Sequence, residues 1–373
     1  MRYEDMRLSS FRFGAGRYLQ GPGMLDNLAE ECARFGSKPL VVAGPRALAA
    51  TEGLWRPGFA AARLPYELQV YGGFPSYREA GRQRDLARDA GCDLVVGVGG
   101  GRVCDLAKLA AEGAGLPVVL APSSCATCAS FSPLSVVYTD EGRCLGYEHF
   151  EYEVAAVLVD TRVMAAQPPR LMAAGIMDAM AKAVEISNGK PQMNSDSDPL
   201  DKCAAFAMAQ FVYDRLEDFG RQAFDDVARL HAEAGRGSAV EPTKAVEDAA
   251  FLAIALTGVV SGMMRAKGQT AVAHRLYELI RTHYFREAAD FLHGEIVACG
   301  LLAQLAYNGD AAGAERLRAF MRTMDMPERL SDMNVPSAPR DLDFLCGLIC
   351  GGESVPDDDA HRARLRESLE VIA

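Results

Sequence analysis

A short apolar strand that runs through three consecutive glycines into a helix constrains the fold of this chain more than any other feature. Residues 93–108 read DLVVGVGGGRVCDLAK, and the valines and leucine before the glycines suit a buried strand of a parallel sheet. Gly99, Gly100 and Gly101 predict a turn with positive φ, which a ligand can approach closely. The unpaired N–H groups and the positive dipole end of the following helix favour an anion. We therefore expect a diphosphate to bind at this turn.

The turn departs from the dinucleotide-binding fingerprint in two respects. Arg102 stands where the fingerprint has its last glycine, and Ala121 and Pro122 stand about twenty residues further on, where the fingerprint has an acidic residue. A tight strand-to-helix turn without a ligand is therefore an alternative interpretation of the same residues.

The composition favours a cytoplasmic enzyme for small molecules. With 373 residues the chain exceeds the size of a single core, so we expect two domains. The net charge is −11 and Lys and Arg form no block, which argues against nucleic acid as a partner. The first residues lack the apolar stretch of an export signal, and no apolar run reaches the roughly 18 residues that span a membrane. Ten scattered cysteines suit the reduced thiols of a cytosol.

Strands and helices alternate in the first part of the chain, which favours a parallel, Rossmann-like sheet covered by helices on both faces. The predicted strands are residues 39–43, 67–71, 93–98, 117–121, 134–138 and 155–160, and the predicted helices between them include 24–35 and 77–90. After Pro168 and Pro169 the sequence has helical periodicity and almost no strand signal. We therefore expect an α/β dinucleotide-binding domain over residues 1–167 and an all-helical metal- and substrate-binding domain over residues 168–373.

Three residues of the helical part have the chemistry of a divalent-metal site. Asp178, His274 and His293 supply a carboxylate and two imidazoles, which suit zinc or ferrous iron with one position open for substrate. Both histidines lie in apolar helical segments, where a histidine is more often a hydrogen-bonded residue of the core, so this alternative stays open. The other histidines, which have the context of surface or turn residues, are His149, His231, His283 and His361.

Several motifs together resemble one known family. They are RYLQGPGMLDNL, GVGGGRVCDLAK, PLSVVYTDEG, VLVDTRVM, AGIMDAMAK and FLHGEIVACG, and they occur in the family's order between residues 12 and 305. On these motifs the chain resembles the glycerol dehydrogenase branch of the iron-containing alcohol dehydrogenase superfamily, which also includes dehydroquinate synthase. The run ATCA, followed by an aromatic residue and PLSV, is most similar to the hydroxycarboxylate dehydrogenase subgroup.

The resemblance implies a dehydroquinate synthase-like fold, in which an α/β nucleotide-binding domain and a helical domain enclose the active site. It implies that Asp178, His274 and His293 are metal ligands and that hydride passes between NAD(P)(H) and the carbon that carries the substrate hydroxyl. It also implies a homo-oligomer, a dimer or larger. By the same resemblance, the cofactor would lie against Gly99, Gly100, Gly101, Arg102 and Asp105 at the pyrophosphate and nearby ribose, and against Ser123, Ser132, Leu134 and Tyr138 at the nicotinamide.

One residue of the substrate pocket differs from the glycerol dehydrogenases. These enzymes have an aspartate that binds a substrate hydroxyl, and Cys128 stands at the aligned position. A thiol is a poor hydrogen-bond partner for a polyol, so the sequence favours a hydroxy acid or 2-oxo acid over glycerol. Cys125 and Cys128 also form a CxxC pair, for which a zinc or redox site is the alternative to small residues of the pocket wall.

A second difference lies one helical turn after the metal carboxylate. Iron-dependent alcohol dehydrogenases have a further histidine ligand there, whereas this chain has Lys182, four residues after Asp178 and on the same face. An ion pair between the two side chains is one interpretation. The other is that Lys182 places a positive charge beside the metal and receives the carboxylate of a 2-oxo acid, which makes it a candidate catalytic residue.

Two further differences concern the nucleotide and the cleft. NAD-using relatives have an aspartate that binds the adenosine ribose where this chain has Gly44, followed by Pro45 and Arg46. Loss of the carboxylate removes repulsion toward a 2′-phosphate, and a nearby guanidinium can bind one, so we predict a preference for NADP over NAD. Tyr277 replaces a histidine of the relatives three residues after His274, a change that bears on proton transfer or on access to the cleft.

The leading interpretation is a metal-dependent NAD(P)(H) oxidoreductase that acts on a small hydroxy acid or 2-oxo acid. A dehydrogenase for glycerol or another diol is the alternative within the same family. A lyase of the dehydroquinate synthase kind would use the same turn and metal. A degenerate nucleotide-binding protein without catalysis is a further alternative, because Cys128 and Tyr277 differ from known active sites. Two histidines and one aspartate accept zinc, iron or manganese alike.

Overall fold

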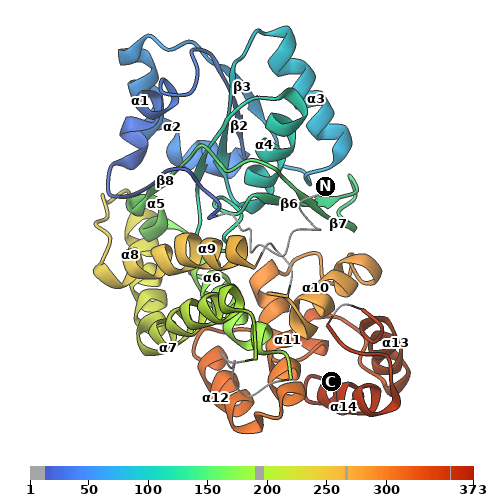
Figure 1. Cartoon of the computed structure of the whole chain (residues 1–373). Helices are drawn as coiled ribbons and strands as arrows, with labels where there is room; N and C mark the ends of the chain where they lie inside the picture. The colour runs from blue at the N-terminus through green and yellow to red at the C-terminus, as the bar shows by residue number, and fades with distance from the viewer. Residues whose placement is uncertain (1–12, 190–196, 265–267, 353) are drawn as a thin grey trace.

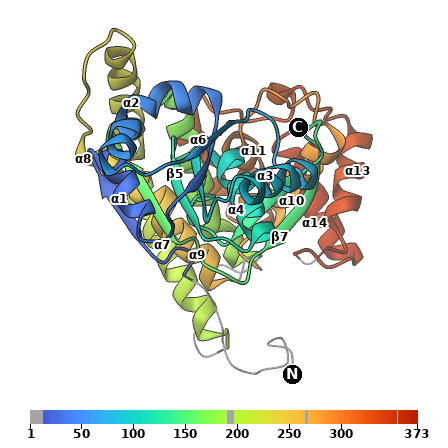
Figure 2. The same ribbon diagram turned by 90° about the horizontal axis from the view of Figure 1, so that it is seen from above.

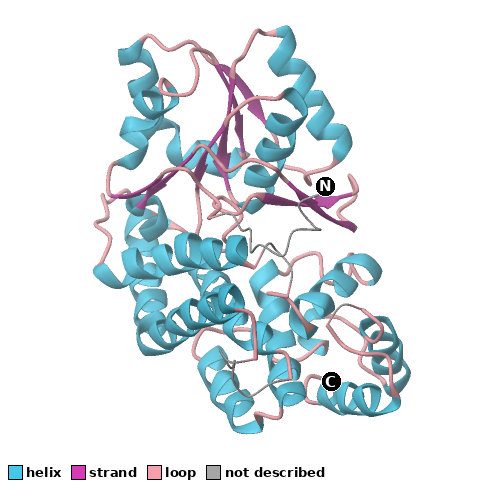
Figure 3. Cartoon of the chain, viewed as in Figure 1, coloured by secondary structure: helices cyan, strands magenta, loops and turns pink. Residues whose placement is uncertain are grey.

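The computed structural model describes residues 13–189, 197–264, 268–352 and 354–373. The strands gather at one end of the molecule and helices build the other end, as Figures 1 and 3 show. In the view from above (Figure 2), α8 (Lys244–Phe251) lies on the opposite side of the molecule from α13 (Pro339–Ile349) and α14 (Asp359–Glu370). An α/β end joined to a helical end is the predicted fold class, which is therefore confirmed.

A six-stranded parallel sheet forms the centre of the α/β end. Its strands are β1 (Tyr18–Gly21), β2 (Pro39–Ala43), β3 (Glu67–Val70), β4 (Leu94–Gly99), β5 (Val118–Pro122) and β8 (Ala156–Asp160). They lie in the order β1-β8-β5-β4-β2-β3, and each neighbouring pair is parallel. The four inner strands are buried along their whole length, as their continuous apolar runs predict.

Helices cover the sheet on both sides. They are the 3-10 turn η2 (Met24–Asn27), α1 (Leu28–Cys32), α2 (Pro45–Ala62), α3 (Tyr77–Asp89) and α4 (Gly101–Ala114). Figure 1 shows α1 and α2 on one side of the strands and α3 and α4 on the other. α2 was not among the predicted helices, and it contains Pro57 in its interior, a residue type that usually ends or bends a helix.

One predicted strand lies outside this sheet. β6 (Leu134–Tyr138) pairs antiparallel with β7 (Cys144–His149) in a separate two-stranded ribbon, so the expectation that residues 134–138 join the parallel sheet is wrong. β1 and β7 were not predicted. Only the first residue of β7 is buried and the others alternate between exposed and half-buried, while β1 is half-buried throughout. Neither strand has the continuous apolar run that marks the inner strands.

The regular elements of the described chain after Asp160 are all helical, apart from one isolated bridge between Cys350 and Val355. Besides α8, α13 and α14 they are α5 (Thr161–Ala166), α6 (Pro169–Ser187), α7 (Leu200–Ala234), the π-helical turn η3 (Leu252–Leu256), α9 (Thr257–Met263), α10 (Val272–His283), α11 (His293–Asn308), α12 (Ala311–Arg322) and the 3-10 turn η4 (Ser331–Met333). α6 and α11 are buried on nearly all sides, which places them at the centre of the helical end.

One helical segment of the described chain, Lys244–Met263, is long and apolar enough to cross a membrane by length and composition. However, 67% of its most apolar window is buried inside the protein. Burial of this extent is typical of a core helix, which satisfies the same criteria of length and composition.

Candidate active site

The predicted phosphate turn joins β4 to α4 at the carboxyl end of the sheet. Gly99 ends the strand, and Gly100 caps the helix with a φ of −73°. None of the three glycines of the turn has positive φ, so that expectation is wrong. Gly99 is required for a different reason, which is the lack of space for a side chain. A Cβ on Gly99 would lie 2.7 Å from the side chain of Val103, so glycine lets α4 pack directly against β4.

The start of α4 lies beside hydroxyl groups of the loop after β5. A Cβ on Gly100 or Gly101 would find no atom closer than 3.1 Å, and the nearest atoms are hydroxyl oxygens of the loop after β5. The N-cap residue makes no side-chain hydrogen bond, so the first N–H groups of the helix can bind a ligand. Arg102, in the first turn, lies over the ring of Phe74, with its guanidinium carbon 4.0 Å from the ring centroid.

A second helix begins beside this turn. β3 lies on one side of β2 and β4 on the other, so the strand order changes direction between β2 and β4, which is where open α/β sheets bind their ligands. α2 begins there with Gly44 as its N-cap, whose N–H donates to the backbone oxygen of Val98 at 3.1 Å. Arg46, in the first turn of α2, is exposed, and no carboxylate of the described residues lies within 4.0 Å of its guanidinium.

Lys108 holds the loop between β5 and β6 against α4. Its ammonium donates to the backbone oxygens of Ala129 at 2.7 Å, Ser132 at 3.1 Å and Leu134, and it lies 3.1 Å from Oδ1 of Asp105. Both side chains of this ion pair are buried. The predicted nicotinamide residues Ser132 and Leu134 are thereby fixed to the helix that begins at the glycine turn.

The ion pair between Asp105 and Lys108 was not foreseen from the sequence. Asp105 was predicted to border the pyrophosphate or ribose, and its carboxylate faces Lys108 in the interior. Burial raises the pKa of Asp105, and the ammonium opposes that rise. A lysine and an aspartate three residues apart in the mainly apolar middle of the helix were the available signal. Ser123, by contrast, lies beside the turn, since its N–H donates to the backbone oxygen of Gly99 at 3.0 Å.

The three predicted metal ligands meet in the helical part. Asp178 comes from α6, His274 from the first turn of α10, and His293 is the first residue of α11. Oδ1 of Asp178 lies 3.1 Å from Nε2 of His293 and 3.4 Å from Nε2 of His274. One ligand atom from each residue lies within 4.8 Å of the others, and no second group of this kind occurs among the described residues. One carboxylate and two imidazoles fit zinc or ferrous iron.

Glu185 orients one of these predicted ligands. Its carboxylate accepts hydrogen bonds from Nδ1 of His274, from the N–H of His274 at 2.9 Å and from the N–H of Ala271 at 2.6 Å. With Nδ1 donating to Glu185, Nε2 is the ring nitrogen that faces Asp178, and in the neutral ring its lone pair would be available to a metal. Glu185 was missed from the sequence, although it follows Asp178 by seven residues, a spacing that puts both on one face of the helix.

Charges within the cluster set its protonation states. Burial alone would raise the pKa of Asp178, but His293, His274 and Lys182 together hold it well below its usual value. Burial alone would lower the pKa of His274, but the carboxylate of Glu185 raises it above its usual value. Burial also lowers the pKa of His293, against the charge of Asp178. At neutral pH Asp178 is therefore ionised and His293 is neutral, as metal binding requires.

Two glycines let the backbone around the cluster meet closely. A Cβ on Gly294 would lie 2.0 Å from the backbone oxygen of Ala174, and one on Gly175 would lie 2.0 Å from that of Cys125. α11 therefore touches α6 directly beside His293, and α6 touches the loop after β5. The absence of side chains at these two positions brings the cluster and the loop together.

Lys182 and Cys128 both lie near the cluster. The ammonium of the buried Lys182 is 3.4 Å from Nε2 of His274. Within the described part of the chain no ion pair under 4.0 Å joins it to Asp178, so the i,i+4 ion pair is not formed here. The pKa of the Cys128 thiol is raised to about 11. Burial is the largest cause, the charge of Asp178 adds to the rise, and Lys182 opposes it. The thiol is therefore neutral at physiological pH.

The other cysteine of the CxxC pair points into the core. Cys125 is fully buried, its N–H donates to Oε1 of Gln167 at 3.2 Å, and its sulfur accepts from Nε2 of Gln167 at 3.1 Å. Both cysteines are free thiols, and neither belongs to the metal-ligand group. The geometry therefore supports pocket and core residues rather than a zinc site at this pair.

Tyr138, a predicted nicotinamide residue, lies close to the metal cluster. Its hydroxyl oxygen is 2.7 Å from that of Tyr277, and both side chains are buried. The ring of Tyr277 stands edge-on to the ring of His293, with 4.2 Å between the centroids. Tyr277, for which the sequence left two roles open, therefore connects Tyr138 to a predicted metal ligand.

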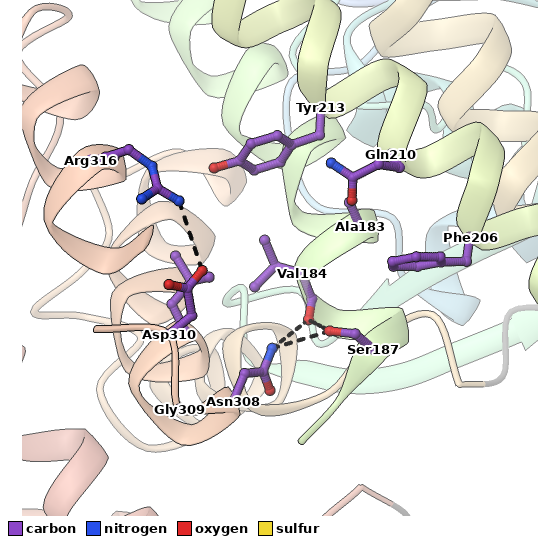
Figure 4. A pocket seen from close by; sticks show the side chains of 11 residues that line it. Ala183, Val184, Ser187, Phe206, Gln210, Tyr213, Asn308, Gly309, Asp310 and Arg316 are labelled. Atoms are coloured by element: carbon purple, nitrogen blue, oxygen red, sulfur yellow. Dashed lines mark hydrogen bonds and ion pairs between the residues drawn. The ribbon is translucent and has the colours of Figure 1, made fainter. Parts of the chain in front are cut away.

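A separate hollow lies on the opposite face of α6. It has a volume of about 330 Å³ and is lined by residues of α6, α7, α11 and α12 and of the turn between the last two. Figure 4 shows Asn308 bonded to Val184 and Ser187, and Arg316 beside Asp310. None of the predicted site residues lines this hollow, so it is distinct from the metal cluster and the glycine turn.

The site combines a parallel sheet, an uncapped helix N-terminus at its carboxyl end, and a helical part that holds a carboxylate and two imidazoles. These are the parts of a metal-dependent dehydrogenase. The family model of the iron-containing alcohol dehydrogenases matches residues 15–161. The chain is 30% identical over 345 residues to a glycerol dehydrogenase of Escherichia coli O6:H1, an alignment that covers 91% of this chain and 89% of that protein. It is also 30% identical over 325 residues to hydroxycarboxylate dehydrogenase A of Escherichia coli K12, covering 86% and 84%.

A solved structure agrees with these relatives. The crystal structure of a probable glycerol dehydrogenase from Sinorhizobium meliloti 1021 has a TM-score of 0.81 and 26% sequence identity, with 98% of each chain covered. The chain belongs to the iron-containing alcohol dehydrogenase family, which confirms the resemblance inferred from its motifs. It is accordingly a metal-dependent oxidoreductase for small molecules, and the family implies a nicotinamide nucleotide and a divalent metal as cofactors.

Proposed function

We propose that this protein interconverts a small 2-hydroxy acid and its 2-oxo acid by hydride transfer with NADP(H), at a site between residues 1–167 and residues 168–373. The observation that carries the proposal is the buried ammonium of Lys182, 3.4 Å from Nε2 of His274. The carboxylates of Asp178 and Glu185 would balance the charge of a divalent cation, and Lys182 would then leave the site with a net positive charge. Such a site favours an anionic substrate.

Each polar residue of the cluster has a separate role in this proposal. Asp178, His274 and His293 would hold the cation, with Glu185 keeping Nε2 of His274 directed at it. A bound divalent cation supplies a Lewis acid for the substrate oxygen, and a bound nicotinamide supplies or accepts the hydride. Lys182 would bind the substrate carboxylate and so orient the neighbouring carbon.

The nucleotide would lie across the carboxyl ends of β2 and β4. The free N–H groups at the start of α4 support binding of the pyrophosphate there. Arg46 is exposed at the start of α2, where it would bind a 2′-phosphate, and Gly44 has no carboxylate to repel one. On these two residues we propose a preference for NADP over NAD.

Oxidation of glycerol or another diol is the second candidate. Two of the similar proteins described above are a glycerol dehydrogenase and a probable glycerol dehydrogenase. The neutral thiol of Cys128, with its pKa raised to about 11, is a poor partner for a second hydroxyl, which favours the hydroxy acid. The two candidates differ in the charge of the substrate, so they are separable by assay.

The assay is NADPH oxidation by the zinc- or iron-loaded protein with 2-oxobutanoate, dihydroxyacetone and propanal. We expect the highest kcat/KM with 2-oxobutanoate and, for that substrate, a higher kcat/KM with NADPH than with NADH. A higher value for dihydroxyacetone would favour the diol enzyme, and a preference for NADH would contradict the assignment of Arg46.

Lys182→Met tests the residue on which the substrate class depends. We expect kcat/KM for 2-oxobutanoate to fall roughly 10- to 100-fold, since a contact between charged groups contributes about 1.5–3 kcal/mol, and kcat/KM for propanal to fall much less. Lys244→Met is the matched control, because it removes the same charge from an exposed ion pair with Asp248 on α8. Equal losses for both substrates would contradict the proposed role of Lys182.

A further inference from the structure

Two buried tyrosines join the halves of the molecule beside the metal cluster. Tyr138 ends β6, in the part of the chain that forms the sheets, and Tyr277 lies in α10 of the helical part, 139 residues later. Their hydroxyl oxygens are 2.7 Å apart, so one hydroxyl donates to the other. Only 8% of Tyr138 and 2% of Tyr277 are exposed, so water does not compete for this hydrogen bond.

A row of ring contacts extends from this hydrogen bond in both directions. On the nucleotide side, the centroids of the Phe74 and Tyr138 rings are 5.4 Å apart, and the guanidinium of Arg102, in the first turn of α4, lies 4.0 Å from the Phe74 centroid. On the other side, the ring of Tyr277 stands edge-on to that of His293 at 4.2 Å. The row therefore connects the helix that begins at the glycine turn with the metal cluster.

Arg281 contacts the ring of Tyr277 and links it to the segment before α11. The guanidinium carbon of Arg281 lies 5.8 Å from the centroid of its ring, and Nη1 of Arg281 donates to the backbone oxygen of Ala288 at 3.0 Å. Ala288 belongs to the segment that leads into α11, whose first residue is His293. Tyr277 is thus fixed to the same backbone that presents the metal ligand.

We propose that Tyr138 and Tyr277 are positioning residues whose hydrogen bond sets the separation between the nicotinamide and the metal cluster. The proposal rests on the proposed function in one respect, which is the placement of the nicotinamide beside Tyr138. Hydride transfer needs the reacting atoms about 3–3.5 Å apart, and a misplacement of about 1 Å costs as much as 100-fold in rate. A hydrogen bond between two packed rings, one from each half, holds such a separation constant.

The test compares Tyr138→Phe, Tyr277→Phe and the double variant with the wild-type protein. Each is loaded with metal and assayed with whichever substrate of the panel above the wild-type protein reduces best. We expect kcat to fall roughly tenfold in each single variant with little change in KM. The double variant should resemble the singles, because the bond needs both hydroxyls. The primary isotope effect with NADPH deuterated at the transferred position should rise, because hydride transfer becomes the slower step.

A second readout uses the protein without metal or nucleotide. Loss of either hydroxyl should increase hydrogen exchange in both β6 and α10, since the bond joins these two elements. Tyr18→Phe is the matched control, because it removes a hydroxyl whose hydrogen bond, to Oε1 of Gln20 at 2.6 Å, stays within β1. The control should leave kcat, the isotope effect and the exchange of both elements unchanged.

Three outcomes would overturn the proposal. They are additive losses in the double variant, an unchanged isotope effect, and a rise in KM without a fall in kcat, which would make Tyr138 a binding contact only. If one single variant does not fold, the other carries the same readouts. Failure of the proposed substrate is distinguishable, because it shows in the wild-type protein alone as a preference for dihydroxyacetone.

Discussion

The two halves of the proposed active site are built in different ways. The nucleotide turn is made of backbone from one contiguous stretch, where β4 ends and α4 begins. The metal cluster is made of side chains from three helices, and two of its members, Asp178 and His293, are 115 residues apart. A local pattern can specify the turn, whereas the cluster exists only once α6, α10 and α11 have packed. Changes in helix packing should therefore disturb metal binding before they disturb nucleotide binding.

The nucleotide half also depends on one buried side chain, that of Lys108. In Lys108→Met, the carboxylate of Asp105 and the backbone oxygens of Ala129, Ser132 and Leu134 lose their buried donor. We expect the free energy of unfolding to fall by about 3–5 kcal/mol, the cost of leaving a buried charge unpaired. The one tryptophan, Trp55, is buried in α2 of the same half, and its fluorescence during denaturation measures the loss.

Arg88→Met is the control for this measurement. Arg88 forms exposed ion pairs with Asp85 and Asp89 on α3, so its removal should cost less than about 1 kcal/mol. A similarly small loss in Lys108→Met would mean that the loop after β5 keeps its place without the ammonium. The nucleotide half would then depend on its contiguous backbone turn and not on this buried ion pair.

Gly294→Ala tests the dependence of the cluster on packing. The added Cβ would lie 2.0 Å from the backbone oxygen of Ala174, so α11 must move away from α6 and take His293 away from Asp178. We expect a loss of about 3 kcal/mol in stability, the upper end for overpacking, and weaker zinc binding. Thermal unfolding and competition with a zinc chelator measure the two effects. Gly53→Ala is the control, because no atom lies within 4 Å of the new Cβ, and it should lower neither the stability nor the zinc affinity.

Glu185→Gln separates the orientation of a ligand from the packing of the helices. The variant keeps the shape of the side chain but loses the charge that faces Nδ1 of His274. We expect zinc affinity to fall about 10- to 100-fold while the thermal stability of the metal-free protein changes less than in Gly294→Ala. Glu315→Gln, an exposed change on α12, is the control. Unchanged zinc affinity would show that packing alone orients His274.

The pH dependence of zinc binding tests whether Glu185 raises the pKa of His274. Glu185 raises the pKa of His274 above its usual value, so a proton on Nε2 competes with the metal. Zinc affinity should be full above that pKa and should fall as the pH decreases through it. In Glu185→Gln the fall should move to lower pH, because the charge that raises the pKa is gone. A fall at the same pH in both proteins would contradict this role of Glu185.

The same contrast explains how far the sequence could predict this molecule. The inner strands and the position of the turn were predicted because continuous apolar runs and glycines are local signals. The positive φ was wrong because Gly99 is required by contact with Val103, a matter of packing rather than of turn geometry. The predicted metal ligands came with the family resemblance, since spacing alone left them open. Lys108 and Glu185 were missed because their spacings from Asp105 and Asp178 show a shared helix face but not that the side chains are buried against their partners.

The smallest expected effect concerns Arg46, the exposed side chain that we propose selects NADP. Arg46→Ala should weaken NADPH binding about fivefold, which corresponds to about 1 kcal/mol, the upper range for an exposed ion pair. NADH is the internal control, because it lacks the 2′-phosphate and its pyrophosphate would still meet the N–H groups of α4 in the proposed binding mode. Fluorescence titration of both nucleotides measures the difference. A loss confined to NADPH would mean that the turn binds what the two nucleotides share and that one exposed residue selects between them. An equal loss for both would place Arg46 at the pyrophosphate, and the nucleotide half would then depend on residues beyond its contiguous turn.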